Sequence, residues 1–144
     1  MSETARFIYE EKDADRFLVD RKVFLAEDVL KREQELIFQT CWIYIGHSSE
    51  IRRPGDFVTR NVAGYPMLFV RGTDGQVRAK VNACPHRGAL VCRERNGNAR
   101  SFTCMYHGWT FNNDGSLRGV PGQEAYGPKF DRARYDLPSA PRLE

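Results

Sequence analysis

Cysteine is scarce in this chain of 144 residues, which has only four: Cys41, Cys84, Cys92 and Cys104. Four cysteines do not suggest the disulfide framework of a small secreted domain. Apolar runs are short, and none approaches the ~18 residues of a membrane-spanning helix. Residues 1–16 are charged and lack the apolar centre of a signal peptide. We therefore expect a cytoplasmic protein with no membrane partner.

Net charge is also small, because 22 basic side chains are balanced by 19 acidic ones to leave +3. This balance gives no reason to expect a nucleic-acid partner. The length allows one domain with at most an appendage, and 41% hydrophobic residues are enough for a compact core. The basic residues are nevertheless uneven, with four arginines close together in the chain: Arg87, Arg93, Arg95 and Arg100. Such a group either docks an acidic partner or forms a solvated basic loop.

Two short strings combine cysteine with histidine. Cys-Pro-His at 84–86 is followed, after 17 residues, by Cys-Met-Tyr-His at 104–107. A Cys-x-His with a later Cys-x-x-His is the ligand set of a Rieske [2Fe–2S] centre, in which two thiolates bind one iron and two imidazoles bind the other. Two neutral imidazoles in place of two thiolates make the cluster less negative and easier to reduce. We therefore predict one set of cofactor and metal ligands: Cys84, His86, Cys104 and His107.

A structural zinc site is the alternative use of these four residues, since cysteine and histidine also bind zinc tetrahedrally. Ordinary Cys2His2 fingers place both cysteines in one pair and both histidines in the other. Each string in this sequence contains one of each, and Gly88 and Gly108 follow them as in two loop tips that grip a cluster from opposite sides. The mixed pairs favour the iron–sulfur cluster over a zinc-stabilised binding module.

The residues around both strings resemble the large (alpha) subunits of bacterial Rieske non-haem iron oxygenases that hydroxylate aromatic rings. The similarity covers nearly the whole chain and rests on residues 84–89 and 106–111, the lead-in 42–47 and Pro-Gly-Asp-Phe at 54–57. It implies the N-terminal Rieske portion of such a dioxygenase. The partners that it implies are a flavin reductase or ferredoxin as electron donor and other alpha subunits in a trimer, with or without beta subunits.

Three positions separate the chain from respiratory Rieske proteins. In the respiratory pattern, the places of Ala89 and Tyr106 hold cysteines that close a disulfide, and the place of Trp109 holds a serine that donates to a cluster sulfur. Removing donors to the sulfurs destabilises the reduced, more negative cluster. We therefore expect a potential toward the low end of the Rieske range.

Histidine is too scarce for a second iron site. A mononuclear oxygen-activating iron uses two histidines and one carboxylate, but with His86 and His107 on the cluster only His47 remains. We interpret His47 as a surface or packing residue and predict no catalytic residue in this chain. The mononuclear Fe(II) is expected only in a catalytic domain that is absent, so the chain looks truncated and by itself only transfers electrons. A stand-alone Rieske ferredoxin is the alternative, against which the long helical lead-in argues.

The periodicity predicts a mainly β fold, an antiparallel Rieske sandwich or barrel preceded by an N-terminal helix. Helically spaced apolar residues predict this helix over 26–40, after a polar arm at 1–21. Short apolar runs between turn residues predict strands, at 42–46, 56–62, 66–70 and 77–81. Asp-Gly pairs predict hairpin turns, at 73–75 and 113–115.

This reading divides the chain into an N-terminal arm and helix at 1–41 and the Rieske domain at 42–144. The two cysteine–histidine strings would lie on hairpin loops at 81–88 and 102–108. We expect Cys41 to be a small buried residue. Trp109 and Phe111 are expected to be core residues of the strand that leaves the second loop, and the alternative is that they cover the cluster from water. Cys92 is given no ligand role.

Overall fold

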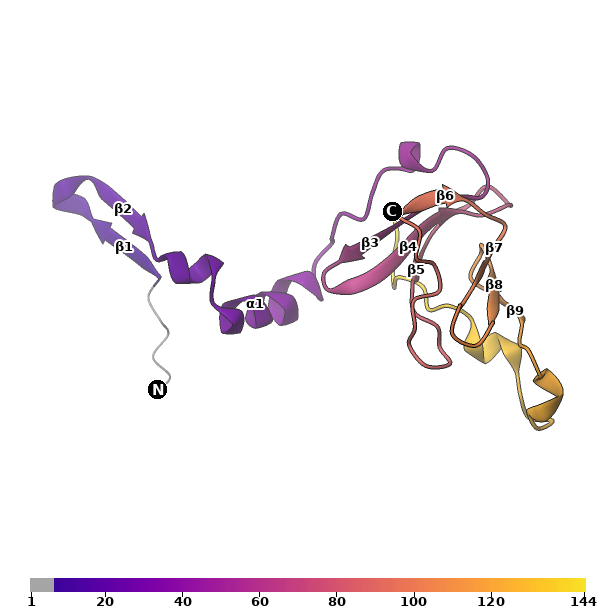
Figure 1. Ribbon diagram of the computed structural model, residues 1–144. Helices are drawn as coiled ribbons and strands as arrows, with labels where there is room; N and C mark the ends of the chain where they lie inside the picture. The colour runs from indigo at the N-terminus through magenta and orange to yellow at the C-terminus, as the bar shows by residue number, and fades with distance from the viewer. Residues whose placement is uncertain (1–6) are drawn as a thin grey trace. The chain divides into compact units, whose positions relative to one another are not determined.

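The computed structural model describes residues 7–144 and divides into two compact units, Met1–Ile43 and Tyr44–Glu144. Figure 1 shows a hairpin and helices in the first unit and most of the strands in the second. Within the described residues, no helix combines the length and apolar character needed to cross a membrane. The fold is mainly antiparallel β, as predicted.

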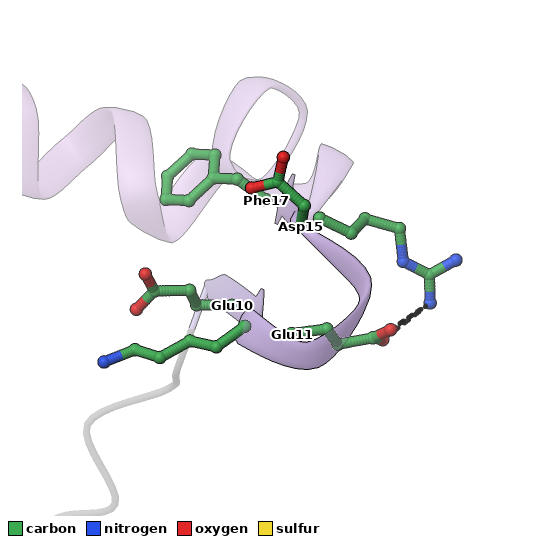
Figure 2. A pocket seen from close by; sticks show the side chains of 6 residues that line it. Glu10, Glu11, Asp15 and Phe17 are labelled. Carbon is green, nitrogen blue, oxygen red and sulfur yellow. Dashed lines mark hydrogen bonds and ion pairs between the residues drawn. The ribbon is translucent and has the colours of Figure 1, made fainter.

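The first unit opens with an antiparallel hairpin of β1 (Ile8–Glu11) and β2 (Arg16–Val19). The segment predicted as a polar arm therefore contains a strand pair that was not predicted, and its first six residues lie outside the described ones. Figure 2 shows a pocket on the hairpin, lined mostly by charged side chains, and the ion pair between Arg16 Nη2 and Glu11 Oε1 at 2.6 Å. Since both partners are exposed, this pair contributes at most about 1 kcal/mol.

The predicted helix is present in the first unit and has two parts. After the short turn η2 (Arg21–Phe24), α1 covers Glu27–Glu33 and continues directly as the π-helical turn η3 (Gln34–Phe38). Cys41 follows this helix and is exposed, so its predicted burial is wrong. The reason is its position beyond the last turn, where its N–H donates to the carbonyl of Ile37 at 2.8 Å.

The second unit contains a four-stranded antiparallel sheet in the order β5-β4-β3-β6. These strands are β3 (Asp56–Val62), β4 (Tyr65–Arg71), β5 (Val77–Val81) and β6 (Asn96–Asn98). Three of the predicted strands correspond to β3, β4 and β5. The strand predicted at 42–46 is wrong, because this segment pairs with no described strand. Its burial nevertheless alternates as in a strand, since Trp42 and Tyr44 are exposed and Ile43 and Ile45 are half-buried.

A second, three-stranded sheet consists of β7 (Ser101–Thr103), β8 (Thr110–Asn112) and β9 (Leu117–Gly119). Side chains of both sheets form one core; Leu68 and Val70 come from the first sheet, and Phe102 and Phe111 from the second. Both predicted hairpin turns are present, and Gly115 in the later one has φ +92°. The arrangement of two antiparallel sheets around a shared core confirms the predicted fold class.

Candidate metal centre

Two loops of the second unit have the same backbone pattern; we call residues 84–89 the first loop and 104–109 the second loop. In the first, the Cys84 N–H donates to the Ala89 carbonyl at 2.8 Å and the Gly88 N–H to the Cys84 carbonyl at 2.7 Å. In the second, the Cys104 N–H donates to the Trp109 carbonyl at 2.8 Å and the Gly108 N–H to the Cys104 carbonyl at 2.9 Å. Each loop therefore closes on its own cysteine.

The second loop is a hairpin loop, as predicted, because it joins the paired strands β7 and β8. The first loop is not a hairpin loop. The chain enters it from β5 and leaves toward β6, which lie at opposite edges of the four-stranded sheet. The first loop has its internal hydrogen bonds, but the two strands that flank it are not paired with each other.

The structure brings the four predicted ligands together as two pairs. The His86 and His107 rings have centroids 4.6 Å apart and planes inclined at 59°. Cys84 and Cys104 are 3% and 2% exposed, and Cys104 lies close enough to Cys84 to help raise the pKa of the Cys84 thiol. Among residues 7–144, no group of three or more His, Cys, Asp or Glu side chains is placed to hold a metal ion. One pair of thiols and one pair of imidazoles are nevertheless the donor types of a Rieske cluster.

The ring nitrogen Nδ1 of His86 is buried and has no hydrogen-bond partner among residues 7–144. A buried polar atom without a partner costs about 1–3 kcal/mol, so such an atom calls for a function. Burial lowers the pKa of His86, and the nearby charges of His107 and Arg87 lower it further. The imidazole is therefore neutral at pH 7, which is the form that binds a metal.

Burial raises the pKa of the Cys84 thiol, while backbone N–H groups of His86 and Arg87 that face the sulfur lower it. In the absence of metal, this thiol keeps its proton at neutral pH. A metal ion bound by Cys84 would have to displace that proton, so that loading of such a site would release protons. The same N–H groups favour negative charge on the sulfur once the thiolate is formed.

Trp109 is 2% exposed and stacks on His86, with ring centroids 4.9 Å apart and planes inclined at 7°. Trp109 also forms T-shaped contacts with three aromatic residues of the C-terminal segment: Tyr126, Phe130 and Tyr135. The prediction of a core residue is confirmed, as it is for Phe111. The sequence did not reveal the stacking on His86 or the aromatic segment behind it; the only signal was the spacing of three aromatic residues after position 125.

His47 forms its hydrogen bonds with Ser49 and Glu50. Its ring Nδ1 accepts the Ser49 N–H at 3.3 Å, and its own N–H donates to Glu50 Oε1 at 2.9 Å. These bonds cap the short helix η4 (Ser48–Glu50). The interpretation of His47 as a structural residue is therefore supported by its contacts.

A model of the Rieske [2Fe-2S] domain family matches residues 41–140. The chain belongs to this family. Its Rieske domain therefore holds a [2Fe–2S] cluster, and the zinc alternative is set aside. The N,N-dimethyl phenylurea N-demethylase subunit alpha of Sphingobium sp. (strain YBL2) is 39% identical over 135 residues, which are 93% of this chain and 29% of that protein.

Two further relatives resemble the Rieske domain to the same degree. The benzene 1,2-dioxygenase subunit alpha of Pseudomonas putida is 39% identical over 103 residues, 72% of this chain and 23% of that protein. The crystal structure of naphthalene 1,2-dioxygenase from Rhodococcus sp. superposes with a TM-score of 0.81 at 39% identity, covering 88% of this chain and 29% of that one. The chain thus spans less than a third of the length of these relatives.

The glycines of the two Rieske loops give a matched test of loop geometry. Gly88 and Gly108 have φ of +73° and +71°. A Cβ atom added at Gly108 would lie 2.9 Å from Pro121 Cγ, whereas a Cβ atom added at Gly88 would have no neighbouring atom within 4 Å among the described residues. We expect Gly88→Ala to lower the free energy of unfolding by about 1–2 kcal/mol for the left-handed conformation alone. Gly108→Ala should lower it further because of the contact with Pro121.

Urea unfolding of the two variants measures this difference. Gly119→Ala is the control. Gly119 does not have a left-handed φ, and a Cβ atom added there would have open space around it. Equal losses for Gly88→Ala and Gly108→Ala, or a comparable loss for Gly119→Ala, would contradict the geometry of the loops.

Proposed function

We propose that Cys84 and Cys104 bind one iron of the Rieske cluster and that His86 and His107 bind the other. The unpartnered Nδ1 of His86, buried beside His107, is the observation that carries this assignment. It is supported by the two equivalent loops that present the cysteines. When bound, the cluster stores one electron at a moderate potential. The chain's own residues orient the ligands, and the stacked Trp109 keeps water from one face of His86.

We propose that the chain, within residues 42–144, is the electron-transfer domain of an aromatic-ring-hydroxylating dioxygenase alpha subunit. The named relatives support this, since two of them are alpha subunits, one of a benzene 1,2-dioxygenase and one of an N-demethylase, and the latter matches 93% of the chain. This coverage favours an alpha subunit over a stand-alone Rieske ferredoxin. The mononuclear iron that receives the electron lies, in this proposal, in a part of the enzyme outside the chain.

A surface around the two loops suits an electron donor. Leu90, Met105 and Tyr106 are large apolar side chains that stay exposed there. Arg93 Nη1 lies 2.9 Å from Met105 Sδ and so links the second loop to the segment that follows the first. Exposed arginines beside exposed apolar side chains favour a partner with an acidic, partly apolar surface. We propose that an NADH-linked flavin reductase or a ferredoxin docks here; alpha subunits in a trimer, with or without beta subunits, complete the assembly.

Anaerobic spectroscopy tests the proposed function. The isolated protein should be brown, contain two irons per chain and, after reduction, give an electron paramagnetic resonance (EPR) signal whose average g lies below the free-electron value. NADH with a flavin reductase, with or without ferredoxin, should reduce it, and raised salt should slow the reaction. A colourless protein that binds zinc would contradict the cluster, and a reduction rate independent of salt would contradict the basic docking surface.

A further inference from the structure

The two ends of the first loop (residues 84–89) are not held together by a strand ladder, unlike those of the second loop. The second loop is closed behind Cys104 by the β7–β8 ladder, in which Thr103 is paired with Thr110. The strands that flank the first loop, β5 and β6, are separated by β4 and β3. No backbone ladder can therefore hold the two ends of the first loop together, although this loop carries two of the four proposed ligands.

The side chain of Asn82 occupies the place of the missing ladder. Asn82 is 3% exposed; its Nδ2 donates to the Cys92 carbonyl at 2.7 Å, and its Oδ1 accepts the Cys92 N–H at 2.8 Å. Its own backbone N–H donates to the Pro66 carbonyl on β4 at 2.8 Å. Asn82 is thus fixed to the sheet by its backbone and binds both backbone groups of Cys92 with one amide, as a neighbouring strand would.

We propose that Asn82 is a positioning residue that closes the first loop and so holds Cys84 and His86 in place for the cluster. The loop then has two successive ties, the Asn82–Cys92 pair outside and the bond from the Cys84 N–H to the Ala89 carbonyl inside. Loss of the amide leaves the N–H and the carbonyl of Cys92 buried without partners, which is costly. This inference rests on the proposed ligand role of Cys84 and His86.

Asn113 provides a matched control for this role. It is the other buried polar side chain of the described core, also 3% exposed, and it bridges backbone groups of the same kind. Its Nδ2 donates to the Ala99 carbonyl at 3.1 Å, and its Oδ1 accepts the Thr73 N–H at 3.3 Å. Neither contact belongs to the two loops, so Asn113→Ala removes a buried amide without opening a ligand loop.

The experiment compares Asn82→Ala, Asn113→Ala and the natural sequence, each with its cluster. Both variants should unfold at lower urea concentrations than the natural chain. Only Asn82→Ala should release iron to a chelator faster, by about tenfold for one lost pair of buried hydrogen bonds, and should shift the EPR g values and the midpoint potential. If Asn82→Ala is recovered without cluster, Asn82→Gln, which keeps the amide donor and the amide acceptor on a longer side chain, is measured and should release iron at an intermediate rate.

Two failures are distinguishable. If the natural chain has no Rieske spectrum, the proposed function is wrong, whatever Asn82 does. If the natural chain has the spectrum and the Asn82 variant that retains its cluster keeps the natural g values, potential and release rate, or if Asn113→Ala changes these quantities equally, Asn82 is only a structural residue and the inference is overturned.

Discussion

Cys104→Ser and His107→Ala should each abolish the Rieske spectrum. Each variant removes one of the two protein ligands proposed for an iron, and the other ligand alone is not expected to hold that iron. Serine offers a harder, more basic oxygen in place of a thiolate, which is a poor substitute in an iron–sulfur cluster. The same result is expected for His86→Ala, whose Nδ1 has no other partner in the structure. Visible absorption and EPR of the purified variants measure the loss.

His47→Ala is the control for the ligand variants. It removes the third histidine of the chain, which caps η4 at the protein surface and takes no part in the two loops. Loss of a cap of this kind costs about 0.5–2 kcal/mol and leaves the spectrum intact. If His47→Ala bleached the protein, or if His107→Ala kept its spectrum, the ligand assignment would be wrong.

Local patterns in the sequence predicted the regular elements that depend on neighbouring residues. Strands β3 and β5 have the predicted bounds, and the helix lies within its predicted range. The segment 42–46 alternates in the same manner but has no partner strand, and a partner is a long-range property. The hairpin of β1 and β2 was missed because all its strand residues are exposed, so that neither strand has a buried face that would alternate with a polar one.

The site was predictable to a similar extent. Spacing alone identified the cysteine–histidine strings, because each string is a local motif on one loop. The contacts that orient these residues join distant parts of the chain: Trp109 stacks on His86, and Asn82 binds Cys92. An asparagine two residues before a cysteine carries no signal of its own. Its role emerges only from the strand order, which leaves the first loop without a ladder.

Trp109→Ala should have the largest effect on stability among single substitutions in the core. Trp109 is 2% exposed and contacts His86 on one face and three aromatic residues at its edges. Truncation of a buried tryptophan to alanine costs about 3–5 kcal/mol, because the transfer free energy is lost and a cavity remains. Urea unfolding measures this loss. Trp109→Phe keeps an aromatic ring in the site and should lose less.

The other tryptophan of the chain gives the matched control. Trp42 is 62% exposed, so Trp42→Ala should change the free energy of unfolding by no more than about 0.5 kcal/mol. The stacking on His86 predicts a second difference: Trp109→Ala exposes one face of the ring to water and to chelators, and should release iron faster than Trp42→Ala does. Equal losses of stability, or equal rates of iron release, would show that Trp109 neither organises the core nor shields the proposed ligand. A loss of stability with an unchanged release rate would leave Trp109 as a core residue whose contact with His86 has no effect on the cluster.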